Sequence, residues 1–337
     1  MDFTHKWRIF TSNKRAYISL ILFVVLFSVS LLAPFIANEK PLFIYHNDRA
    51  YFPVFVNYTE SEFGGDFESY TDYLDPYVQE VLLKDSVVIT APIPYSYDTI
   101  IFDLGTPSPT PPDSKHILGT DDKSRDVAAR ILYGLRLSII FGLLLTIFSV
   151  LIGVALGALQ GYYGGALDLV GQRLIEIWNS VPILFVIIII SNFITPNFWW
   201  ILGIILAFSW ISLVSVVRAE FLKARNLEYV KAAKALGLSK FTIMLRHILP
   251  NAMVATITYI PFIMASGIIT LGSLDFLGFG MPAQSASLGE ILAQGKNNLT
   301  SPHLGISVFI VLSVLLSILV FIGEGIRDAF DPHSKAR

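Results

Sequence analysis

The sequence predicts an all-α integral membrane protein with six transmembrane helices and a small irregular, partly β-structured insert on the external side. Hydrophobic residues make up 54% of the 337 residues and charged residues only 15%, which is far from the composition of soluble domains. Five uncharged runs reach the length of about 20 residues that crosses a bilayer as a helix. Basic and acidic residues are also segregated between the segments that join these runs, which gives the chain an orientation.

The uncharged runs define the helices in order. The first run, Ala16–Asn38, lacks the small-residue cleavage site of a removable signal peptide, so we expect a retained helix. The other runs are Leu137–Leu167, Ile177–Arg218, Ile248–Leu274 and Leu304–Gly323. The run that starts at Ile177 is about twice the spanning length. Pro196-Asn197 divides it, which predicts one helix over about 174–194 and another over about 198–217.

Glycines and prolines inside the runs predict where helices approach closely or bend. The spacing of the glycines permits close helix packing, and these residues are Gly142, Gly153, Gly157 and Gly161. Pro182 and Pro261 lie within or near spans and are expected to kink them.

Lysines and arginines predict the orientation. They concentrate before the first run, between 218 and 247, and after the last run. Because short basic loops stay in the cytoplasm, we expect these three segments on the cytoplasmic side. The predicted organisation is 1–38 for the N-terminus and helix one, 39–135 for an external insert, 136–325 for helices two to six with a cytoplasmic loop at 218–247, and 326–337 for a cytoplasmic tail.

The external insert is acidic. Residues 38–135 contain 16 Asp or Glu against 7 Lys or Arg, a net charge of −9 in a chain whose total is −2. Its aromatic content is too high for a disordered segment, and Ala50–Asn57 and Ser86–Ile93 are β-prone. We expect a small ordered cap that stabilises the bundle, covers a pathway mouth or contacts external partners. Electrostatic steering favours contact, through Glu60, Glu62, Asp66 and Glu68.

A short polar helix lies between two apolar runs, from Asn226 to Gly237. Its apolar residues recur at helical spacing on one face, and they are Tyr229, Ala232, Ala233 and Leu236. Gly237 suits the left-handed residue that ends a helix, and Ser239 suits the cap of the next helix. A helix of about ten residues is marginal alone in water, so we expect it to pack against something, such as another subunit.

The pattern Ala232-Ala233-x3-Gly237 followed by Leu249-Pro250 resembles the cytoplasmic coupling loop of permease subunits in bacterial ABC importers. Lys231 stands where that family has a glutamate, and His247 stands where it has an isoleucine. The resemblance implies that the loop docks into a groove of an ATPase subunit. The residues assigned to this contact are Glu228, Lys231, Ala232, Ala233, Gly237, Leu249 and Pro250. The alternative is an amphipathic connector between two membrane helices.

Other segments extend the resemblance to dipeptide and oligopeptide permeases. The matching pieces are Leu118–Asp121 with Arg125-Asp126 and Arg130–Gly134, Gly161–Gly165 with Asp168, Asp275–Gly280 with Ser287–Glu290, and Gly323-Glu324 through Asp331-Pro332. Ser124 occupies the place of a usual glycine. Pieces of the insert, such as Asn57–Gly65, resemble the Yej-type branch, which imports peptides and the peptide-nucleotide antibiotic microcin C.

This resemblance implies a non-catalytic permease subunit of an ATP-driven, binding-protein-dependent importer of short peptides in the bacterial inner membrane. The implied partners are a second homologous permease, one or more ABC ATPase subunits, an extracytoplasmic peptide-binding protein and membrane lipid, without nucleic acid. We expect no cofactor in this chain, because ATP and Mg²⁺ would be bound by the partner ATPase.

Two other classes stay open as alternatives. An ion-coupled secondary transporter places ionisable groups within the bilayer, whereas the charges here fall near span ends, at Arg136, Asp168, Arg173, Glu176, Arg218 and Glu324. A passive channel or scaffold is the other alternative. A nucleotide site is disfavoured, because the Gly289–Asn297 stretch has the wrong spacing for a phosphate-binding loop. The histidines show no metal-ligand spacing.

Overall fold

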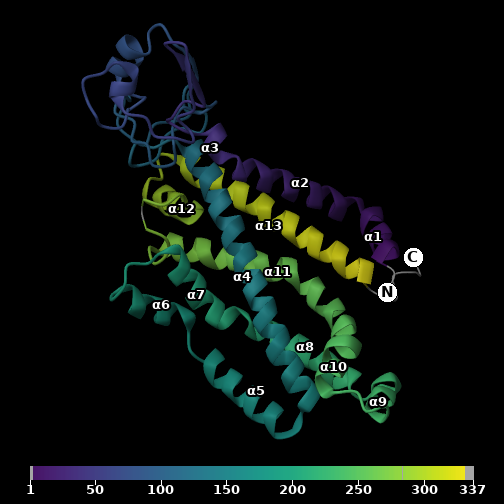
Figure 1. Ribbon diagram of the computed structural model, residues 1–337. Helices are drawn as coiled ribbons and strands as arrows, with labels where there is room; N and C mark the ends of the chain where they lie inside the picture. The colour runs from purple at the N-terminus through teal and green to yellow at the C-terminus, as the bar shows by residue number, and fades with distance from the viewer. Residues whose placement is uncertain (1–2, 283, 331–337) are drawn as a thin grey trace. The chain divides into compact units, whose positions relative to one another are not determined.

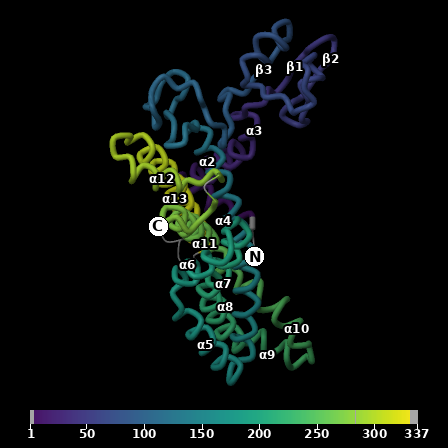
Figure 2. Tube along the Cα trace, turned by 90° about the vertical axis from the view of Figure 1, so that its left-hand side faces the viewer, coloured from purple at the N-terminus to yellow at the C-terminus, as the bar shows by residue number. Residues whose placement is uncertain are grey.

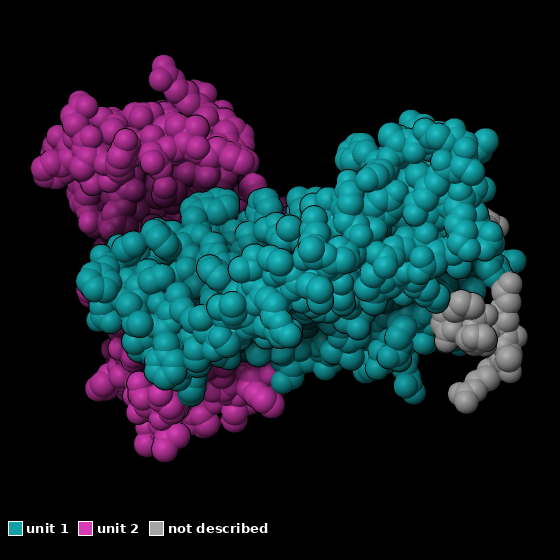
Figure 3. Space-filling model, turned by 90° about the horizontal axis from the view of Figure 1, so that it is seen from below, with its two compact units in different colours: residues 1–24, 138–282, 312–337 teal, residues 25–137, 283–311 magenta. Residues whose placement is uncertain are grey.

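The computed structural model describes residues 3–282 and 284–330. The chain divides into two compact units, coloured separately in Figure 3. Unit 1 comprises residues 1–24, 138–282 and 312–337, and unit 2 comprises residues 25–137 and 283–311. The matched pair Asp331-Pro332 and the rest of the predicted tail beyond residue 330 lie outside the described residues.

Among the described residues, five helical stretches are long and apolar enough to cross a membrane. They are α2 (Lys14–Leu31), α4 (Val127–Tyr163), α7 with α8 (Phe198–Ser209 and Ile211–Ala224), Lys240–Leu277 and α13 (Pro302–Phe330). The fourth stretch begins with α10 (Lys240–Thr242) and a π-helical turn (Ile243–Ile248) and continues as α11 (Leu249–Leu277), as Figure 1 shows. The all-helical membrane fold predicted from the uncharged runs is confirmed.

The remaining span is broken. Helices α5 (Gly165–Asn179) and α6 (Ile183–Ser191) are bent by 59° and together make up to a sixth span. The helix predicted over about 174–194 is therefore interrupted at residues 180–182, next to Pro182, where a kink was expected. Pro182 has no N–H and disfavours helical backbone at Val181, so the helix ends before this pair. Pro261, in contrast, lies inside α11, which continues through it.

Glycines allow α4 and α8 to pack closely in unit 1. A Cβ built on each glycine would lie 2.9, 2.8 or 2.5 Å from the Cβ of its neighbour, in the pairs Gly153 with Leu213, Gly157 with Val217 and Gly161 with Phe221. Such distances leave no room for a side chain, so the four-residue spacing is a helix-packing motif. Gly142 approaches α11 in the same way, with Met264 at 3.0 Å. The packing predicted for these glycines is confirmed.

The N-terminal helices pack on the C-terminal one in unit 1. Helix α1 (Phe3–Ser12) precedes α2, and a buried cluster joins Phe10 of α1 and Ala16 of α2 to Ala329 of α13. A short helix, α3 (Ala33–Ile36), then follows α2 in unit 2.

The insert holds a three-stranded antiparallel sheet in the order β2-β1-β3. Its strands are β1 (Phe43–His46), β2 (Arg49–Tyr51) and β3 (Val87–Ile89). Asn47 and Asp48 both have positive φ, which suits the tight turn between β1 and β2. The small sheet is as predicted, although the β-prone piece at 50–57 leaves the sheet after Tyr51 and β1 was missed. Irregular turns around the sheet include the helical segments Glu60–Phe63 and Val78–Leu82.

The insert has its own apolar core, which explains how it is ordered without disulfides. The buried residues share one cluster, which includes one residue each of β1 and β2: Ile44, Tyr51, Phe63, Tyr73, Val78, Leu82 and Leu83. Helix α12 (Leu288–Asn297) also belongs to unit 2.

Candidate functional site

The predicted coupling loop forms a helical corner in unit 1. Helix α8 ends at Ala224, α9 (Glu228–Ala235) follows, and the chain then turns into α10. Figures 1 and 2 show α9 and α10 side by side, at the same end of unit 1 as α5. The corner is thus a distinct surface element attached to the ends of two spanning stretches.

Backbone hydrogen bonds fix the turn after α9. Gly237 has φ of 79°, as its position in the sequence predicted. Its N–H donates to the Lys234 carbonyl at 3.0 Å, and the Leu238 N–H donates to the Ala233 carbonyl at 3.2 Å. This pair of bonds is the Schellman motif that satisfies the last carbonyls of a helix. Ser239 then caps α10 by accepting a bond from the Thr242 N–H at 3.2 Å, also as predicted.

One face of α9 joins the core of unit 1. Val230 and Ala233 are buried in a cluster with residues of α8 and the π-helical turn, including Phe221 and Met244. The apolar residues predicted to share one face are therefore divided. Ala233 packs inside the chain, but Tyr229, Ala232 and Leu236 are exposed.

The exposed side of the corner is apolar at several positions. Leu236 keeps 81% of its surface in solvent and Phe241 of α10 keeps 70%, with Leu238 partly exposed beside them. Clustered apolar side chains on a polar surface mark sites of protein contact. Leu238 and Phe241 were not among the residues predicted from the sequence, although both flank the helix stop that the sequence reveals.

The charged residues of α9 pair with each other. Lys231 Nζ lies 2.9 Å from Glu228 Oε1, and both side chains are exposed. A surface pair of this kind contributes at most a few tenths of a kcal/mol. Both groups therefore stay available to a partner, and the lysine that replaces the family glutamate is tolerated within the chain itself.

The last two predicted residues of the loop lie at the start of α11. Leu249 is partly buried against the same core cluster as Val230, and Pro250 is exposed. The Asn251 side-chain amide donates to the Tyr229 hydroxyl at 3.4 Å, which links this position to α9. The structure therefore brings the Leu249-Pro250 part of the predicted motif next to the helix that carries Ala232 and Ala233.

Ion pairing anchors the beginning of the loop. Arg218 binds Asp168 of α5 through two hydrogen bonds, one of them 2.6 Å between Nη2 and Oδ2. Arg225 also donates to the Gly161 carbonyl of α4 at 3.4 Å. These contacts tie α4, α5 and α8 together where the chain leaves the membrane span. Two charges 50 residues apart give no local pairing signal, so the sequence did not predict this contact.

The acidic residues proposed for external contact lie in one short stretch of the insert. Glu62, Asp66 and Glu68 are exposed and Glu60 is half-buried. Glu62 Oε1 accepts a bond from the Thr59 N–H at 3.4 Å, so this residue also caps a 3-10 turn. No ion pair of these four residues is found in the part of the chain that the structure describes.

A buried charge network in unit 2 joins two of the segments that carry the resemblance, the one before and at the start of α4 and the one at Ser287–Glu290. Arg130 Nη2 lies 2.6 Å from Glu290 Oε2, and Arg125 Nη2 lies 2.6 Å from Asp121 Oδ2. Arg130 and Asp121 are fully buried. Buried charges are retained only when they are paired, so this network has an architectural role in fixing α12 against the start of α4. Ser124, at the usual glycine position, adopts φ of 59°.

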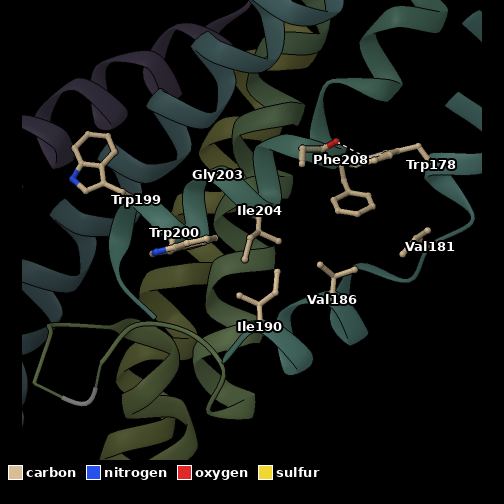
Figure 4. Close-up of a pocket in the computed structure, with 10 residues that line it drawn as sticks. Trp178, Val181, Val186, Ile190, Trp199, Trp200, Gly203, Ile204 and Phe208 are labelled. Atoms are coloured by element: carbon tan, nitrogen blue, oxygen red, sulfur yellow. Dashed lines mark hydrogen bonds between the residues drawn. The ribbon is translucent and has the colours of Figure 1, made fainter. Parts of the chain in front are cut away.

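An apolar pocket of about 530 Å³ lies beside the break between α5 and α6. Figure 4 shows Val186 and Ile190 of α6 facing Ile204 and Phe208 of α7 across it. The Trp178 indole N–H donates to the Ala207 carbonyl at 2.9 Å, which holds the end of α5 against α7. The lining carries no charged group.

The chain matches two sequence families. The family of the binding-protein-dependent transport system inner membrane component matches residues 149–335, and the N-terminal TM domain of oligopeptide transport permease C matches residues 4–57. The chain belongs to this family of inner-membrane ABC importer permeases, and within it to the Yej-type branch that its motifs indicated.

The relatives of this chain include two YejE permeases and a dipeptide permease. The inner membrane ABC transporter permease protein YejE of Escherichia coli is 54% identical over 97% of this chain and 96% of the relative. The peptidoglycan transport system permease protein YejE of Agrobacterium fabrum is 49% identical over 98% and 93%. The dipeptide transport system permease protein DppC of Bacillus subtilis is 34% identical over 66% and 70%.

A solved structure confirms the fold. A chain of the MetNI methionine ABC transporter in an inward-facing conformation superposes with a TM-score of 0.52 at 15% identity, over 60% of this chain and 96% of that one. The protein is therefore a multi-pass inner-membrane permease with the fold of an ABC importer subunit.

Proposed function

We propose that this chain is the transmembrane permease subunit of an ATP-driven importer of short peptides. The observation that carries the proposal is the corner at 226–250. Its turn is closed by backbone hydrogen bonds at Gly237 and Leu238, Val230 and Ala233 pack inward, and Leu236 and Phe241 are exposed. Such an element transmits rigid-body motion from a docked ATPase to the spans attached to it.

The assembly around this chain follows from that role. It comprises a second homologous permease, ABC ATPase subunits that bind ATP and Mg²⁺, and an extracytoplasmic peptide-binding protein. This chain is non-catalytic and holds no cofactor. Its termini and the corner lie in the cytoplasm, and the insert lies outside. The dipeptide permease among its relatives supports peptide cargo, and the branch extends the proposal to peptide antibiotics of the microcin C type.

The charge distribution counts against an ion-coupled carrier. Asp168 is paired with Arg218 near the corner, and Arg130 is paired with Glu290 in the buried network. Both carboxylates are therefore already bound to arginines, whereas an ion-coupled carrier needs an ionisable group that is open to its coupling ion.

Uptake of a labelled tripeptide into cells tests the function. The complete importer, the importer without this chain, and the importer with an inactivated ATPase are compared in a strain without other peptide importers. We expect uptake only with the complete importer. Uptake that persists with the inactive ATPase and stops when the proton gradient is dissipated would instead establish an ion-coupled carrier.

A further inference from the structure

Unit 1 contains a second cavity, of about 560 Å³, whose lining is partly polar. It lies along α8 and α11, and Phe208 lines both this cavity and the apolar pocket of Figure 4. Hydroxyl and amide side chains distinguish it from that pocket, and these are Asn179, Ser209, Ser212, Ser215, Tyr259, Ser266 and Thr270. The two cavities therefore present different chemistry at the depth of the membrane.

The hydroxyl groups follow helical periodicity. On α11, Ser266 follows Tyr259 by seven residues and Thr270 follows Ser266 by four, which places them on one face. On α8, Ser212 and Ser215 are three residues apart and both are exposed. Hydrocarbon offers no hydrogen-bond partner to such groups. A polar stripe on each of two facing helices therefore indicates a surface that meets water or a polar ligand instead of lipid.

Some of these groups already have partners within the chain. Ser209 bonds Ser149 at 2.5 Å, and Thr270 donates to the Ser266 carbonyl at 2.8 Å. Over residues 3–282 and 284–330, no hydrogen bond is found for the side chains of Asn179, Ser215, Tyr259 or Ser266. These four residues line the cavity, and the hydrogen-bonding capacity of their side chains is unused within the described chain.

The lining also restricts the ligand by charge. No Asp, Glu, Lys or Arg lines the cavity, and its remaining walls are apolar, as at Leu145 and Phe262. A metal ion or a charged headgroup would find no compensating charge there. A peptide backbone fits, because it is neutral, carries donors and acceptors at regular spacing, and leaves side chains of varied size to the apolar walls.

We propose that this hydroxyl-lined cavity is a contact site for the peptide backbone on the transport pathway, an inference that rests on the proposed function. Uncharged donors and acceptors hold a backbone without selecting its side chains. Weak contacts of this kind let a substrate enter and leave, as conduction requires. The site would therefore contribute little to selectivity among peptides. A charged residue placed in it would make transport depend on the charge of the peptide, which the native cavity does not.

Cysteine modification tests the location in the assembled importer. The chain has no cysteine, so Ser266→Cys introduces a unique thiol, and Ile269→Cys is a matched control three residues away, exposed but outside the lining. A small water-soluble methanethiosulfonate is applied to membranes with the binding protein present, with and without saturating tripeptide. We expect Ser266→Cys to react, and to react at least fivefold more slowly with tripeptide, while Ile269→Cys shows no effect of tripeptide.

An unreactive Ser266→Cys in an importer that still transports would overturn the inference, because the second permease or lipid would then cover the cavity. Reaction that tripeptide does not slow would overturn it as well.

A charge substitution tests the chemistry through uptake. Ser266→Glu should reduce uptake of an acidic tripeptide at least tenfold more than uptake of a basic one, whereas Ser266→Ala should change both by less than threefold. An unchanged preference in an assembled Ser266→Glu importer would contradict the inference. Failure of the assembled wild-type importer to take up any peptide would instead defeat the proposed function itself, so the two failures are distinguishable.

Discussion

The amide of Leu238 donates a hydrogen bond to the carbonyl of Ala233 at 3.2 Å, across the left-handed residue Gly237. Ala233 faces the core of unit 1, and Leu238 lies on the exposed side of the corner. This single bond therefore joins the packed face of α9 to the surface proposed for ATPase docking. We expect this closed turn to carry a movement of that surface to the core.

Replacing Gly237 tests whether the turn matters for coupling. No atom lies within 4 Å of a Cβ built at this position, so Gly237→Val fails through backbone strain alone. Left-handed backbone costs a β-branched residue about 1–2 kcal/mol or more. We expect the variant to insert normally but to lose ATPase association or to hydrolyse ATP without transport, in a reconstituted complex. Gly237→Asn is the control, because asparagine tolerates this conformation and should retain most activity. Normal association and uptake in Gly237→Val would remove the docking hypothesis.

The second prediction concerns the charge on α9. Lys231→Glu restores the family residue but places two glutamates three positions apart, since Lys231 now pairs with Glu228. The local cost is about 0.2–0.5 kcal/mol, because both side chains are exposed. Uptake should stay within about threefold of wild type. Complete loss of uptake with intact assembly would show that the ATPase surface facing this chain has an altered charge.

Hydropathy and turn chemistry were enough to predict the five continuous spanning stretches and the turn after α9, because both depend on local sequence. Uncharged length defines a span, and Gly237 and Ser239 specify their own backbone geometry. The inward face of α9 was not predictable in the same way. Apolar spacing placed Ala232, Ala233 and Leu236 on one face. Only the packed structure shows that Ala233 lies in the core of unit 1, whereas Ala232 and Leu236 stay exposed.

Other features needed the three-dimensional structure because they join distant segments. The pairing of Asp168 with Arg218 links residues 50 positions apart. The break before α6 was signalled by Pro182, although the sequence alone did not show that the two halves would bend by 59° instead of kinking slightly. Strand β1 was missed because four residues between turns carry too short a pattern to stand out.

The third prediction is the membrane topology. The absence of native cysteines permits single thiols at chosen positions. We expect an impermeant maleimide added to intact cells to label Tyr70→Cys in the insert and to leave Lys234→Cys of α9 unlabelled until the membrane is permeabilised. Both side chains are exposed, so burial does not confound the comparison. The reverse labelling pattern would refute the orientation and with it the docking site.

The fourth prediction concerns the acidic insert. Replacing Glu60, Glu62, Asp66 and Glu68 by their amides should slow association of the binding protein, most strongly at low salt, because screening shortens the range of the field to about 10 Å at 0.1 M. Gln at position 62 keeps the acceptor that caps the 3-10 turn. Association rates of the wild-type and variant importers are measured against ionic strength.

A second set of substitutions controls for net charge. Amides at Asp48, Glu80, Asp85 and Asp103 remove the same charge from elsewhere in the insert. Equal slowing in both sets would assign the effect to the whole insert. Unchanged rates in the first set would eliminate steering by these residues, and loss of assembly would assign them a stabilising role.

The contact partner of Leu236 tests the central claim most directly. A photoreactive benzophenone maleimide is attached to Leu236→Cys in the assembled, ATP-hydrolysing importer, and Phe193→Cys, which is 84% exposed against 81% for Leu236, serves as the control. Irradiation should capture the ATPase subunit from position 236 and not from position 193. Capture of no protein, or of another subunit only, from position 236 of an importer that still hydrolyses ATP and transports peptide would contradict the account.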